Sequence, residues 1–204
     1  MVKYMKDKLF TFDLDGTVTR EEILPMLAKY LDLQEELSLL TKLTLSGDID
    51  FYNSFRLRFY VLNNIPISEI HKIIKKVPLD DKIVKFIQEN KENCVIVTGN
   101  LNLWIEPLAE LLGCRICSSI GNILDDGRIY LMEVMEKGST IRQLRKEYKN
   151  IIAVGDSNND VPMFEEADIA IAYGGVHKPS DKARLNSDYV VYDGGSLCKL
   201  LKML

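Results

Sequence analysis

The sequence predicts an α/β fold in which a Rossmann-like, doubly wound parallel sheet carries a small inserted helical cap. Short apolar runs rich in β-branched residues alternate along the chain with amphipathic helical patterns, an order typical of parallel sheets. The clearest strands are expected at 9–12, 94–97 and 151–154. Helical patterns fill the chain from about residue 20 to 78, which is too much for a simple crossover between two strands.

The elements follow in order along the chain. Within the insertion, helices are expected at 21–31, 33–45, 50–62 and 68–75. Beyond it, the patterns predict helices at 80–89, 101–112, 137–148, 161 onward, 178–185 and 196–204, with strands at 115–118, 168–172 and 188–192 and a hairpin at 121–130. We therefore expect a core domain formed by residues 1–19 and 79–204, and a helical cap domain formed by residues 20–78.

Composition limits the classes of partner. The net charge of −4 provides no basic surface for nucleic acid and no polybasic patch for a membrane, and no apolar run is long enough to span a bilayer. The polar N-terminus and four scattered cysteines predict a cytoplasmic protein. Cys114 and Cys117 form a lone Cys-x-x-Cys that is expected to pack in the interior, and His71 and His177 are expected at the surface without metal-ligating company. The oligomeric state stays open.

Two strand exits are acidic. Asp13 and Asp15 follow the strand at 9–12 with a spacing of two, which puts both on one side of an extended backbone. Asp156 and Asp160 follow the strand at 151–154. Two like charges this close are costly unless a cation lies between them, and oxygen ligands suit Mg²⁺. The pattern therefore suggests a magnesium site and a carboxylate nucleophile, with exposed turn aspartates as the alternative.

Two further sites have the chemistry to hold phosphate. Thr98, Gly99 and Asn100 follow the strand at 94–97, where a hydroxyl and backbone amides could bind phosphate oxygens or only cap a helix. Lys137 lies just before a predicted helix start, where the positive end of the helix dipole disfavours a structural cation. That conflict favours a functional role for Lys137.

These four exits, in this order, resemble the four motifs of the haloacid dehalogenase (HAD) superfamily in its Asp-x-Asp phosphatase branch. They are Asp13-Leu14-Asp15-Gly16-Thr17, Thr98-Gly99-Asn100, Lys137, and Gly155-Asp156-Ser157-Asn158-Asn159-Asp160. The helical insertion also lies where that superfamily carries its first type of cap. Within the superfamily, the chain is most similar to the phosphoserine phosphatase family, which implies a role in serine biosynthesis.

The resemblance implies a mechanism and a role for each motif. Asp13 would be the nucleophile that forms an aspartyl-phosphate, and Asp15 the general acid and base. Mg²⁺ would be held by the Asp13 side chain, the Asp15 carbonyl and Asp156. Thr98, Lys137 and amides at the helix starts would hold the phosphoryl oxygens, and Asp160 would support this shell. The substrate-binding set implied by the resemblance is Glu22, Phe51, Arg58, Thr98, Gly99, Asn100, Lys137 and Asn159.

The substrate end is matched less specifically. The resemblance assigns Glu22 to a substrate ammonium, Arg58 to a carboxylate and Phe51 to an apolar lid. The chain departs from the family by carrying Thr98 for Ser and Asn100 for Gly, with Ser157 also replacing a Gly. Another small phosphometabolite, or phosphate transfer to an alcohol, therefore remains an alternative. A phospho-Asp receiver module is remote because the strand at 94–97 ends in Thr98, where such a module would carry its phosphate-accepting Asp.

Overall fold

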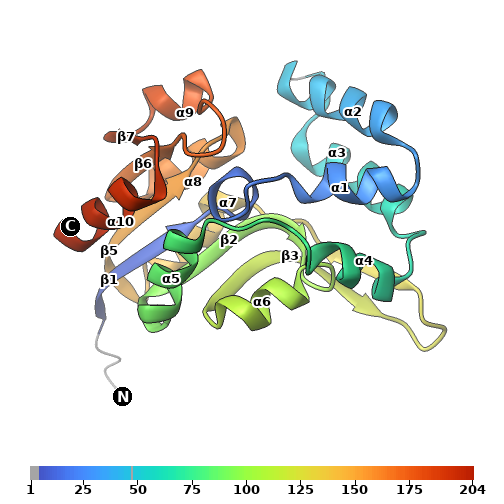
Figure 1. Ribbon diagram of the computed structural model, residues 1–204, viewed down its shortest axis with the longest axis horizontal. Coiled ribbons are helices and arrows are strands. Elements are labelled where there is room, and N and C mark those ends of the chain that lie inside the picture. Colours follow the sequence, from blue (N-terminus) through green and yellow to red (C-terminus); the bar gives the residue numbers. More distant parts are fainter. Residues whose placement is uncertain (1–4, 47) are drawn as a thin grey trace.

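The computed structural model describes residues 5–46 and 48–204 and confirms the predicted doubly wound α/β fold. Seven strands of the described chain form one sheet in the order β4-β3-β2-β1-β5-β6-β7 (Figure 1), and every neighbouring pair is parallel except β3–β4. The strands are β1 Lys6–Phe12, β2 Cys94–Leu101, β3 Arg115–Ile123, β4 Ile129–Glu133, β5 Tyr148–Gly155, β6 Ile169–Tyr173 and β7 Tyr189–Val191.

Helices cover both faces of the sheet. The α-helices of the described residues are α1 Ile23–Tyr30, α2 Gln34–Ser46, α3 Phe51–Leu62, α4 Ile67–Ile74, α5 Asp81–Glu89, α6 Glu106–Leu112, α7 Lys137–Leu144, α8 Val161–Glu166, α9 Asp181–Leu185 and α10 Gly194–Met203. The helices α5 to α10 pack on the faces of the sheet, and α1 to α4 form the insertion. None of the helices in residues 5–46 and 48–204 is long and apolar enough to cross a membrane.

Alternating side chains of the central strands form two separate apolar cores. Leu9 and Val95 pack with α7, α8 and α9 on one face. Phe10 and Ile96, their neighbours in sequence, pack with α5, α6 and α10 on the other. Both faces are buried, so each central strand is apolar at nearly every position, which is the pattern that made these strands recognisable in the sequence.

The helices α1 to α4 leave and rejoin the core at one place. Thr19 pairs antiparallel with Leu79, and the backbone N–H of Asp80 donates to the carbonyl of Val18 at 2.9 Å. Figure 1 shows α1, α2 and α3 standing beside the sheet on this narrow connection. Trp104, after β2, is fully buried, and its ring stacks on Phe59 of α3 at 6.1 Å between centroids. The insertion thus shares an apolar core with the sheet.

One boundary differs from the prediction in a way that affects the site. A helix was expected at 101–112, but β2 runs to Leu101 and α6 begins only at Glu106. The strand continues to Leu101 because Leu101 pairs with Ser119 of β3, and the Asn102 side chain that follows accepts a hydrogen bond from the backbone N–H of Gly121 at 2.8 Å. This extension holds residues 98–100 in strand geometry next to the end of β1.

Candidate active site

The turn after β1 sets the direction of the two acidic side chains. Residues Leu14–Val18 form a single wide helical turn in which Gly16 takes a φ of +70°, a conformation that other residues rarely adopt. A Cβ at Gly16 would also lie 3.1 Å from Asp156 Cγ. The turn therefore needs glycine for its backbone, and glycine also allows the ends of β1 and β5 to approach each other.

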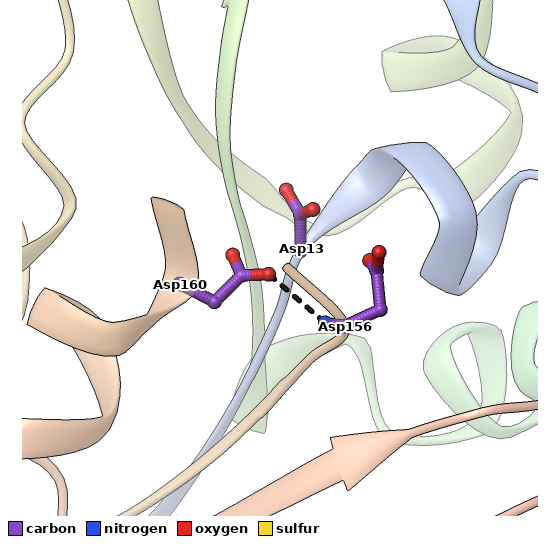
Figure 2. Close-up of side chains that lie close together, drawn as sticks. All are labelled: Asp13, Asp156 and Asp160. Atoms are coloured by element: carbon purple, nitrogen blue, oxygen red, sulfur yellow. Dashed lines mark hydrogen bonds between the residues drawn. The ribbon is translucent and has the colours of Figure 1, made fainter. Parts of the chain in front are cut away.

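Lys137 joins the two acidic exits into one buried cluster. Its Nζ lies 2.6 Å from Asp13 Oδ1 and 2.5 Å from Asp160 Oδ1. The other oxygen of Asp160, Oδ2, accepts hydrogen bonds from the backbone N–H groups of Asp156 and Ser157, both at 2.9 Å. Carboxylate oxygens of Asp13, Asp156 and Asp160 all lie within 4.8 Å of one another, and Figure 2 shows these side chains gathered at the same edge of the sheet.

The cluster carries more negative than positive charge. Burial raises the pKa of Asp13 well above its usual range, and the neighbouring carboxylates, Asp160 foremost, add to this effect against the opposing ammonium of Lys137. Burial disfavours the charged form of Lys137, but Asp13 and Asp160 outweigh it and raise the pKa of that ammonium. Four carboxylates, those of Asp13, Asp15, Asp156 and Asp160, thus face one ammonium. A divalent cation would offset this excess.

Asp15 is held from both sides. Its Oδ1 accepts a hydrogen bond at 2.8 Å from the backbone N–H of Ile23, the first residue of α1, and its Oδ2 accepts one at 2.5 Å from Asn100 Nδ2. Burial raises the pKa of Asp15 to about 6, although both hydrogen bonds act in the opposite direction. A carboxyl group with such a pKa can release and regain a proton near neutral pH.

Thr98 has a hydroxyl group that is free to donate. Its Oγ1 accepts hydrogen bonds from the backbone N–H of Asn100 at 3.2 Å and from Asn100 Nδ2 at 3.0 Å, and it donates to no other described group. Gly99 lies beneath the ring of Phe51, since a Cβ at Gly99 would come within 2.7 Å of that ring. The exit of β2 therefore offers a free O–H group under an apolar lid from α3.

One cavity unites most of the predicted site residues. It is lined by Asp13, Asp15, Glu22, Leu24, Phe51, Phe55, Arg58, Thr98, Gly99, Asn100, Asp156, Ser157 and Asn159. Lys137 and Asp160 do not line it, because they lie buried behind Asp13. Lys137 is predicted to contact the substrate, and here its ammonium lies against Asp13, the predicted nucleophile; the contact with substrate stays a prediction.

The insertion contributes opposite charges to this cavity. Arg58 is buried, and its Nη2 donates to Thr41 Oγ1 at 3.0 Å. No described carboxylate lies within 4 Å of the Arg58 guanidinium. Glu22 is exposed at the cavity mouth, where partial burial and the carboxylates of Asp15 and Asp156 raise its pKa to about 7. Burial lowers the pKa of Arg58, and the charge of Glu22 acts against that effect.

The comparisons with known proteins agree with this geometry. The chain matches the haloacid dehalogenase-like hydrolase family over residues 10–165. It belongs to that family. A phosphoserine phosphatase of Methanocaldococcus jannaschii is 27% identical to this hydrolase over 181 residues, which cover 82% of the chain and 86% of the relative. A phosphoserine phosphatase of Archaeoglobus fulgidus is 29% identical over 179 residues, and the chain spans 52% of that longer relative.

Solved structures lead to the same family. A phosphoserine phosphatase from T. onnurineus, crystallised with NDSB-201, is 25% identical with a TM-score of 0.76, and the match covers 100% of this hydrolase and 98% of the other chain. A structure described as a phospho-aspartyl intermediate analogue of phosphoserine phosphatase has the same fold, with a TM-score of 0.75 at 24% identity and coverage of 98% and 99%. Together the findings support a phosphomonoester hydrolase.

Sequence reasoning missed two contacts of this hydrolase's acidic cluster. His177 was expected to lack ligand-like company, which is wrong, because its Nε2 lies 2.7 Å from Asp156 Oδ2. The other oxygen, Asp156 Oδ1, accepts a hydrogen bond from Thr17 Oγ1 at 3.1 Å. His177 lies in the loop after β6, and only the pairing of β6 with β5 brings that loop to Asp156. His71 lies away from the acidic cluster: its Nε2 lies 2.8 Å from the carbonyl of Leu103 and 3.7 Å from Glu106 Oε2.

Proposed function

We propose that the chain is a Mg²⁺-dependent phosphomonoester hydrolase that converts L-phosphoserine to L-serine and phosphate. One observation carries this proposal. A single cavity is lined by Asp13 and Asp15 from the end of β1 and by Glu22 and Arg58 from the insertion. The named relatives are phosphoserine phosphatases, which supports the same assignment.

The two charged walls suit a zwitterionic amino acid. The buried guanidinium of Arg58 has five donors in a planar fork and would bind the substrate carboxylate, which would supply the missing negative partner. Glu22 would accept hydrogen bonds from the substrate ammonium, whose positive charge would relieve the repulsion from Asp15 and Asp156. A sugar phosphate offers neither charge, so the two side chains would favour phosphoserine over such an ester.

Phosphate would be transferred in two steps, first to Asp13 and then to water. A carboxylate oxygen of Asp13 attacks phosphorus, the bond from phosphorus to the serine oxygen breaks, and that oxygen takes the electron pair and a proton from Asp15. Water then attacks phosphorus, gives its proton to Asp15, and displaces the Asp13 carboxylate. The Thr98 O–H donates to a phosphoryl oxygen throughout, while the Lys137 ammonium lowers the pKa of Asp13 against the effect of burial and so favours its attacking carboxylate form.

The acidic cluster fits Mg²⁺ by the chemistry of its donors. The carboxylates of Asp13, Asp156 and Asp160 converge there, and oxygen donors of this kind suit Mg²⁺. The ion would be held by Asp13, Asp156 and the Asp15 carbonyl, while Asp160 would support this set by holding Lys137 and two backbone N–H groups. When bound, Mg²⁺ would neutralise phosphate charge that otherwise repels the Asp13 carboxylate.

The insertion would act as a cap. Residues 20–78 join the core only through the paired passage at Thr19 and Leu79, and they supply Glu22, Phe51 and Arg58 to the cavity. Movement about that passage would admit substrate and then exclude bulk water from the aspartyl-phosphate until the attacking water is in place.

The test is phosphate release from a panel of phosphomonoesters, with Mg²⁺ and with a chelator. The panel contains L-phosphoserine, phosphothreonine, sugar phosphates and mononucleotides. The expected result is Mg²⁺-dependent release that is fastest from phosphoserine. Adding an alcohol such as homoserine checks for phosphate transfer to an acceptor other than water. Faster release from a sugar phosphate would discard the roles given to Glu22 and Arg58 but retain that of Asp13.

Paired variants sharpen this test. Arg58→Ala should raise the KM for phosphoserine about ten- to a hundredfold, because a charge-assisted contact is lost. Arg56→Ala is the matched control, since Arg56 lies on the same helix but stacks on Tyr52 and does not line the cavity. Equal effects of the two substitutions on KM would contradict the proposed substrate.

A further inference from the structure

Asn100 is one of the three positions at which the chain departs from the family pattern, and its contacts suggest a reason. Its Nδ2 donates to Asp15 Oδ2 at 2.5 Å and to Thr98 Oγ1 at 3.0 Å. Asn100 and Asp15 are 85 residues apart in the chain, so the contact depends on the parallel pairing of β1 with β2. We propose that Asn100 is a positioning residue that orients the carboxyl group of Asp15 for proton transfer to the leaving oxygen; this inference rests on the proposed function.

Asn100 lines the cavity, but its side-chain hydrogen bonds are directed at Asp15 and Thr98. Only 3% of the residue is exposed, and its Oδ1 is buried with no hydrogen-bond partner in the described chain. Both amide hydrogens are used by Asp15 and Thr98. A substrate in the cavity would therefore contact the carboxyl group of Asp15, which Asn100 orients, and would gain little binding energy from Asn100 itself.

Two hydrogen bonds hold the carboxyl group of Asp15, one from the cap and one from the core. On the cap side, the backbone N–H of Ile23 donates to Asp15 Oδ1 at 2.8 Å. On the core side, Asn100 donates to Asp15 Oδ2. Asp15 itself lies in the turn between β1 and the cap, so a single hydrogen bond from Ile23 would leave the carboxyl plane free to rotate about that contact. The second bond fixes the plane, and fixed orientation of an acid relative to the leaving oxygen is what proton transfer requires.

Loss of the Asn100 side chain should leave phosphate binding largely intact. The backbone N–H of residue 100 also donates to Thr98 Oγ1, at 3.2 Å, so the hydroxyl keeps one of its two donors in Asn100→Ala. Lys137, Asp13 and Asp160 make no hydrogen bond with Asn100. The substitution should therefore act on the proton transfer and spare the attack on phosphorus.

Leaving groups of different basicity separate these two effects. A serine-type alkoxide must be protonated as it leaves, whereas p-nitrophenolate is a stable anion that leaves without an acid. The measured quantity is kcat/KM, which reports the steps up to release of the alcohol or phenol. The esters are p-nitrophenyl phosphate and whichever alkyl phosphate of the panel the wild-type protein hydrolyses fastest, so the choice does not depend on phosphoserine being the substrate.

We expect Asn100→Ala to lower kcat/KM about ten- to a hundredfold for the alkyl ester and less than about threefold for p-nitrophenyl phosphate. Asn102→Ala is the control, since Asn102 lies two residues further on and bonds Gly121 outside the cavity. It should leave the ratio of the two kcat/KM values unchanged. If Asn100 had a merely structural role, Asn100→Ala would lower kcat/KM by the same factor for both esters.

The possible outcomes test the positioning role of Asn100 separately from the proposed phosphatase activity. Equal losses on the two esters in Asn100→Ala, or no loss on either, would overturn the positioning role and leave the phosphatase proposal standing. If wild-type protein releases phosphate from neither ester with Mg²⁺ present, the proposed function fails and the inference falls with it. A selective loss on the alkyl ester supports both.

Discussion

Replacing Asp160 by asparagine tests how the buried cluster is held together. Asp160 is fully buried and accepts four hydrogen bonds, from Lys137 Nζ, the backbone N–H groups of Asp156 and Ser157, and Ser157 Oγ. Asparagine has a single acceptor oxygen. If that oxygen stays with the backbone N–H groups, the new NH₂ faces the Lys137 ammonium across a distance of 2.5 Å, donor against donor.

The magnitude follows from these contacts. Loss of a charge-assisted hydrogen bond costs about 1.5–3 kcal/mol, and breaking a buried ion pair costs about 3–5 kcal/mol. Removing one carboxylate also relieves the repulsion that Asp160 exerts on Asp13 and Asp156. We therefore expect Asp160→Asn to reduce the free energy of unfolding by about 2–4 kcal/mol, or to lower Tm by roughly 5–15 °C for a chain of this length.

The assay is thermal unfolding followed by circular dichroism, with and without Mg²⁺. Asp7→Asn is the control, because Asp7 and Lys149 form an ion pair of similar length, 2.8 Å, that is exposed to solvent. That substitution should keep Tm within about 2 °C of wild type. The reasoning is refuted if Asp160→Asn lowers Tm no more than Asp7→Asn does.

The remaining predictions concern pH, metal and the loop after β5. The folded-state pKa of Asp15, about 6, lies above the ordinary value of 3.8, so between these values the folded protein binds more protons than the unfolded chain. Tm of the metal-free protein should therefore fall as pH rises from 4 to 7, and excess Mg²⁺ should reduce that fall. His177→Ala should raise about tenfold the Mg²⁺ concentration that gives half of the Tm increase, whereas His71→Ala should not. Gly155→Ala puts a Cβ 2.5 Å from Asp160 Cγ and should destabilise by about 1–3 kcal/mol in urea unfolding.

Much of the fold could be predicted because its signals are local. Residues 9–12, 94–97 and 151–154 are apolar at almost every position, as strands buried on both faces must be, and the structure has β1, β2 and β5 there. The helix expected at 101–112 was placed too early, since a pairing with β3 keeps Leu101 in a strand. Helical periodicity cannot report a competing partner that lies elsewhere in the chain.

The site, like the fold, has features that could be predicted from the sequence and others that could not. Asp13 and Asp15, two residues apart, were recognisable as a pair, and parallel strand ends meet at one edge of a sheet, so Asp156 could be expected near them. The contacts that tune these carboxylates were not predictable. His177 reaches Asp156 from the loop after β6, and Asn100 reaches Asp15 from the end of β2. Neither contact has a spacing in the sequence that could reveal it.

The sequence by itself determined which residue types stand at the strand ends, and hence the acidic, phosphate-directed chemistry of the chain. Only the tertiary structure decided how these groups are used. The order of the strands buries Lys137 between Asp13 and Asp160, where it does not line the cavity, and leaves Arg58 lining the cavity without a carboxylate partner within 4 Å in the described chain. The physical reason is that burial and charge pairing depend on distances between segments far apart in the chain, and folding alone sets those distances.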